Sequence, residues 1–103
     1  MQIKVGALDV PIEFKKLDED IWGQYNNYTT PSIWISEGLK PEHEALTVLH
    51  EVIECIVDTY GLQVSESAIR VLENVLGAIA MDNPEEVIRW VNRLSKPKFD
   101  EKI

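Results

Sequence analysis

One histidine and two glutamates lie close together in the segment 47–55, whose sequence is TVLHEVIEC. His50 and Glu54 are four residues apart, so on a helix they share one face, one turn apart, and can reach one metal ion. Glu51 projects about 100° further around such a helix. In the H-E-x-x-H helix of zinc hydrolases the glutamate at this position is the general base. The segment therefore indicates metal-assisted hydrolysis, with Glu54 in place of the second histidine.

The same spacing also describes a simple ion pair on a solvated helix face, which stabilises a helix by roughly 0.2–0.5 kcal/mol. The surrounding residues are unusually apolar and predict a central, mostly buried helix. A polar stripe remains on that helix, formed by Thr47, Glu51, Glu54 and Asp58 with His50 beside it. Carboxylates crowded on one face repel one another unless a cation compensates them. Two interpretations stay open: the stripe holds a cation, or it faces water.

A zinc site needs a third protein ligand, which we expect from the following helix. Glu73 is the candidate, because apolar residues flank it on both sides and a charged side chain is uncommon in such a place. Glu66 is the second choice, because a glutamate in the first turn of a helix is explained by the helix dipole alone. His43 lies two turns before His50, roughly 10.5 Å along the axis, and is too distant to share the ion.

The elements that must position these residues change in type near Lys40. Before it, alternating segments predict two hairpins, the first from residues 2–5 and 10–14 and the second from residues 22–28 and 33–35. After it, the punctuation predicts three helices: one from Pro41 to about Tyr60, one after Ser65 as N-cap, and one beginning at Pro84 with Asn83 as its cap. The expected fold is α+β, with a small antiparallel sheet of about four strands followed by three helices.

Composition limits the class of protein. The 103 residues suit one domain, predicted to span 1–95, with a frayed tail at 96–103. The net charge of −8 argues against nucleic-acid binding, which requires a basic face. No apolar run approaches the ~20 residues of a membrane span, and the N-terminus lacks the pattern of a signal peptide. One cysteine, Cys55, cannot form an internal disulfide, so we expect a cytoplasmic protein. We expect Cys55 itself to pack as a small buried hydrophobe.

With these motifs in view, the chain resembles ImmA/IrrE-type metallopeptidase-like proteins of the gluzincin type, especially short versions encoded by phages and prophages. The resemblance covers roughly residues 22–91. It rests on the order and spacing of four short features, namely Gly23, Ile33-Trp34-Ile35, the residues 47–51 (TVLHE) and Asp82-Asn83-Pro84.

The resemblance implies a minimal zincin-like core that hydrolyses peptide bonds with zinc. It places the first metal ligand on His50, the general base on Glu51, the second ligand on Glu54 and a third acidic ligand near Glu73. A set of one histidine and two glutamates is harder and more anionic than the family's usual set, so Mn²⁺ or Fe²⁺ would also suit it. The extra negative charge is expected to raise the pKa of a coordinated water and slow hydrolysis near neutral pH.

Two functional hypotheses therefore stand side by side. In the first, the chain is a small metallopeptidase acting on a protein or peptide in the cytoplasm, which is the host's cytoplasm if a phage encodes it. In the second, it is a degenerate, non-catalytic and metal-free relative that binds a host or phage regulatory protein. The acidic charge alone supports a third hypothesis, mimicry of DNA.

Overall fold

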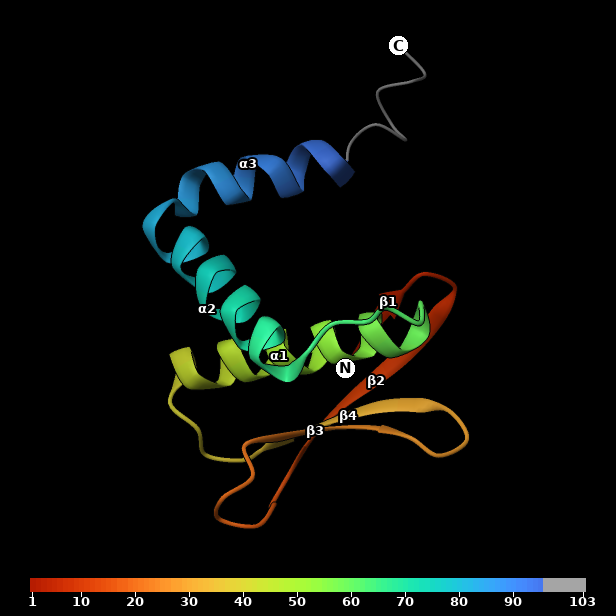
Figure 1. The fold of residues 1–103 in the computed structure, drawn as a ribbon. Helices are drawn as coiled ribbons and strands as arrows, with labels where there is room; N and C mark the ends of the chain where they lie inside the picture. Colours follow the sequence, from red (N-terminus) through yellow and green to blue (C-terminus); the bar gives the residue numbers. More distant parts are fainter. Residues whose placement is uncertain (96–103) are drawn as a thin grey trace. The chain divides into compact units, whose positions relative to one another are not determined.

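The computed structural model describes residues 1–95, which form four strands followed by three helices (Figure 1). The elements are β1 (Gln2–Val5), β2 (Leu8–Lys15), β3 (Gly23–Asn27), β4 (Pro31–Ser36), α1 (Pro41–Thr59), α2 (Glu66–Asp82) and α3 (Pro84–Ser95). The predicted α+β class is confirmed. The chain divides into two compact units, Met1–Glu73 and the part from Asn74 onward. One domain over residues 1–95 stays a prediction, and the tail predicted at 96–103 lies outside the described residues.

The sheet has the strand order β1-β2-β4-β3. Both predicted hairpins are present, since β1 pairs antiparallel with β2 and β3 pairs antiparallel with β4. The expectation of a wholly antiparallel sheet was wrong, because β2 and β4 are parallel and the sheet is mixed. The chain leaves β2, forms the outer strand β3 first and returns along β4 beside β2. Pro11 pairs only with β1, and pairing with β4 begins at Ile12, so the missing N–H of the proline costs no ladder bond to β4.

The core of the first unit lies between the sheet and α1, which crosses it (Figure 1). Its buried members are Val5, Val10, Ile12, Ile33, Ile35 and Cys55. Because side chains alternate along a strand, Trp34 points to the opposite face from its two isoleucine neighbours, where the Lys15 Nζ lies 4.0 Å from the centre of its ring. Cys55 is fully buried, which confirms that it packs as a small hydrophobe.

The helix ends largely follow the predicted capping and helix-terminating residues. α1 stops before Gly61, whose φ of 62° is the left-handed conformation expected of a helix-terminating glycine. The Ser65 Oγ accepts a hydrogen bond from the Ala68 N–H at 3.1 Å and caps α2 as predicted. Asn83 differs from its prediction. Its side-chain amide donates to the Ile79 carbonyl oxygen at 3.0 Å, so it closes the end of α2 and does not cap α3 with its side chain.

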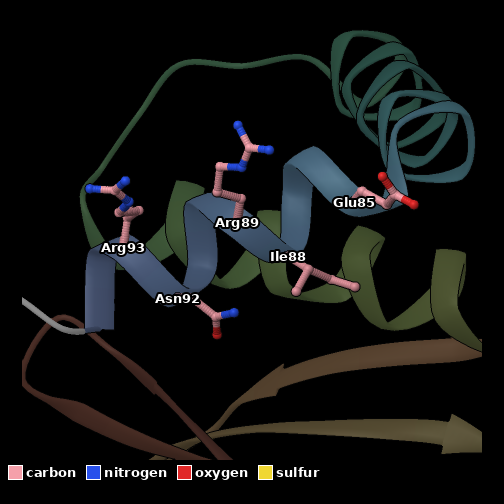
Figure 2. Close-up of a pocket in the computed structure, with 5 residues that line it drawn as sticks. All are labelled: Glu85, Ile88, Arg89, Asn92 and Arg93. Carbon is pink, nitrogen blue, oxygen red and sulfur yellow. The ribbon is translucent and has the colours of Figure 1, made fainter.

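The second unit contains α3, an amphipathic helix with no buried residue. A surface pocket on it is lined by five residues of this helix alone: Glu85, Ile88, Arg89, Asn92 and Arg93 (Figure 2). None of the residues predicted to do chemistry lines this pocket. No helix within residues 1–95 is both long enough and apolar enough to cross a bilayer.

Candidate metal centre

The edge strand β3 lies directly against the side of α1 that carries Glu51. At Gly23 the strand comes so close to the side chains of α1 that an added Cβ would lie 2.6 Å from the Thr47 Cγ2 and 3.0 Å from the Glu51 Cγ. A side chain at this position would force the Thr47 and Glu51 side chains to shift. The close approach covers both α1 side chains, leaving Thr47 7% and Glu51 5% exposed. Half of the predicted polar stripe therefore faces the sheet and not water.

A second contact fixes β3 further along α1. The Tyr25 hydroxyl and the Asn27 side-chain amide each donate to the Asp58 Oδ2 at 2.7 Å. Burial and the hydrogen bond to Asp58 hold the pKa of Tyr25 above its usual value. The hydrogen bonds from Tyr25 and Asn27 lower the pKa of Asp58. Since Gly23 and Tyr25 both face α1, the strand is held alongside the helix at two points.

His50 is the centre of a cluster that joins α1 to the first half of α2. Its Nε2 lies 3.5 Å from the Glu54 Oε1 and 3.0 Å from the Glu66 Oε1. Its Nδ1 lies 3.0 Å from the Glu73 Oε1. The structure thus brings together His50, Glu54 and both glutamates of α2 that the sequence offered as a third ligand. The imidazole side chain is only 12% exposed.

Glu51 is the most unusual carboxyl group of this cluster. Burial, a hydrogen bond to Glu54 and the negative charges of Glu54, Glu66 and Glu73 raise the pKa of Glu51 to about 8. These surroundings therefore favour the protonated form of Glu51 in the metal-free molecule. A buried carboxyl surrounded by other carboxylates is a common sign of a functional site.

The donor set suits a divalent metal ion. Ligand atoms of His50, Glu51 and Glu54 all lie within 4.8 Å of one another, so this group can hold a cation. Within residues 1–95, no lysine or arginine forms an ion pair with Glu51, Glu54, Glu66 or Glu73. Among the described residues, four glutamates thus gather around one imidazole without a lysine or arginine paired to them, and one nitrogen with several carboxylate oxygens is a donor set for zinc, manganese or iron.

Other residues considered for the site lie apart from it. His43 stacks on Trp22 with ring centres 4.8 Å apart, which agrees with its predicted exclusion from the ion. The packing of β3 over Glu51 was missed by sequence reasoning. The signal for this packing was Gly23, the first residue of β3. A glycine in a strand leaves room for another element to approach closely.

The chain was compared with protein-family models, curated proteins and solved structures, and none of the three comparisons found a match. The resemblance to ImmA/IrrE-type proteins therefore stays a prediction from short motifs.

Proposed function

We propose that the chain is a small metal-dependent peptidase of the cytoplasm. His50, Glu54 and a glutamate of α2 hold one zinc ion, or a manganese or iron ion in its place. The observation that carries this proposal is the position of His50, whose ring nitrogens both face carboxylates while the buried Glu51 lies in the same cluster. Carboxylates gathered in a partly buried place repel one another, and a bound cation would compensate this negative charge.

The residues of the chain have distinct roles in this proposal. A bound divalent ion supplies Lewis acidity, which polarises a peptide carbonyl and makes water a better nucleophile. Glu51 takes the proton from the attacking water and later delivers it to the leaving amine. Burial against Gly23 fixes the direction of the Glu51 side chain, which supports this role because a general base must be positioned before the reaction.

The edge strand supports a peptide as the substrate. β3 is the last strand of the sheet, and its outer edge is unpaired within residues 1–95. An extended peptide can add to such an edge through main-chain hydrogen bonds. Because β3 is held against α1 at Gly23 and Tyr25, a peptide added to β3 would run alongside the helix that carries His50 and Glu51.

The test is a cleavage assay with an unstructured basic protein as the probe, chosen because the chain carries a net charge of −8. We expect the zinc-loaded chain to produce discrete fragments, detected by mass spectrometry. A chelator should stop cleavage, and added zinc should restore it. A His43→Ala variant is the matched control, since it removes the other histidine of α1 and should cleave normally.

Failure of the zinc-loaded chain to cleave this probe or a mixed peptide library would contradict the proposal. If zinc is nevertheless bound, the chain would be a metal-binding regulator. Capture of a regulatory protein that a chelator leaves unchanged would favour the non-catalytic alternative.

A further inference from the structure

The two glutamates of α2 lie on opposite sides of the His50 ring. Glu66 faces Nε2 and Glu73 faces Nδ1, each at 3.0 Å. The lone pairs of the two ring nitrogens diverge, so ions bound at about 2.0–2.1 Å from each would be about 6 Å apart. One ion can therefore use Glu66 or Glu73 together with His50, but not both.

The Nε2 side of the ring faces more carboxylates than the Nδ1 side. It faces Glu54 at 3.5 Å and Glu66 at 3.0 Å, whereas the Nδ1 side faces Glu73 alone. Ligands of a tetrahedral zinc ion, each about 2.0–2.2 Å from the metal, lie about 3.3 Å from one another. Both Nε2 distances are close to this value. Three protein ligands and one open position are also the usual composition of a catalytic zinc site.

We propose that Glu66 is the third metal ligand and that Glu73 is a positioning residue. This inference rests on the proposed metal site and departs from the assignment that the family resemblance implies. Glu73 accepts the Nδ1–H of His50, which leaves the Nε2 lone pair free for the metal and fixes the plane of the ring. Metal-bound histidines commonly donate their other N–H to a carboxylate in this way.

The exposure of the two carboxylates agrees with these roles. The Glu73 side chain is 13% exposed, and its hydrogen bond to the ring is sheltered from water. The Glu66 side chain is 53% exposed, so the site has an open side from which a metal ion and a substrate can approach. Glu51, which is 5% exposed, belongs to the same cluster, and its ligand atom lies within 4.8 Å of those of His50 and Glu54.

The first test compares the zinc affinities of the whole chain and three variants, measured by competition with a chromophoric chelator. We expect Glu66→Gln to weaken zinc binding at least about 100-fold, because it removes a ligand. We expect Glu73→Gln to weaken it about 10-fold, as is usual for a partner of a histidine ligand. Glu85→Gln is the matched control, because it makes the same change in the first turn of α3 and should leave affinity unchanged.

The second test reads the protonation of the His50 ring directly. Nitrogen-15 spectra of the zinc-loaded chain report which ring nitrogen of His50 carries the proton. We expect the proton on Nδ1 and the metal on Nε2, and Glu73→Gln should broaden or shift the Nδ1–H signal while Glu85→Gln should not. A metal on Nδ1, or a larger loss of affinity in Glu73→Gln than in Glu66→Gln, would overturn this assignment alone. If the unaltered chain binds no zinc, the proposed function fails as well.

Discussion

Replacing Glu51 by glutamine is expected to lower peptide hydrolysis at least about 100-fold while the protein still binds its metal. Glutamine has nearly the same shape as glutamate but cannot accept a proton from water. Loss of a general base commonly costs about 10²–10⁴-fold in rate. Glu51 packs against β3 and is only 5% exposed. A substitution that keeps its volume should therefore leave the helix and the strand in place.

The measurement is the initial rate of cleavage at equal metal occupancy, together with the zinc content of each protein. Glu42→Gln is the matched control, since it makes the same change in the first turn of α1, two turns from His50. Hydrolysis by Glu51→Gln at the rate of the unaltered protein would show that Glu51 is not the base. Loss of zinc from this variant would instead make Glu51 a ligand.

The second large effect is a fall in the stability of the metal-free protein between pH 5 and pH 8. The pKa of Glu51 is about 8 in the folded chain, against an ordinary value of 4.5. Between these two values the folded chain holds a proton that the unfolded chain releases. The free energy of unfolding therefore decreases as the pH rises, by about 1.4 kcal/mol per unit at most. With partial screening by water, we expect a loss of about 2–3 kcal/mol over this range.

Urea unfolding of chelator-treated protein at pH 5, 6.5 and 8 measures this loss. Glu51→Gln has no group to titrate at this position, so its stability should change much less over the same range. At pH 8 the free energy of unfolding of Glu51→Gln should exceed that of the unaltered chain. Equal pH dependence in the two proteins would contradict the account of Glu51. A bound divalent ion should reverse the trend, because a cation favours the ionised carboxylate and metal binding releases its proton.

The elements could be predicted from the sequence because their ends carry local signals. Pro41, Ser65 and Gly61 act on the backbone beside them, so the helix limits follow from a few neighbouring residues. The parallel pairing of β2 with β4 could not be predicted. Alternation fixes which face of a strand is buried, but it is the same whether the neighbouring strand is parallel or antiparallel.

Only the part of the candidate site that lies within the single helix α1 could be predicted from the sequence. The spacing of His50 and Glu54 places both on one face of α1, and they do lie together. The choice between Glu66 and Glu73 depends on how α2 crosses α1, because each meets a different ring nitrogen. The burial of Glu51 depends on the approach of β3 at Gly23. Contacts between elements are not encoded in the spacing within either one.

Metal content is the measurement that tests the proposed site most directly. The whole chain should be purified without a chelator or a metal-affinity column, beside a His50→Ala variant, and analysed by elemental mass spectrometry. We expect about one zinc, manganese or iron ion per chain, and loss of that ion in the variant because it removes the only nitrogen ligand of the proposed set. No bound metal in the unaltered chain, even after incubation with zinc, would contradict the metal site and the peptidase built upon it.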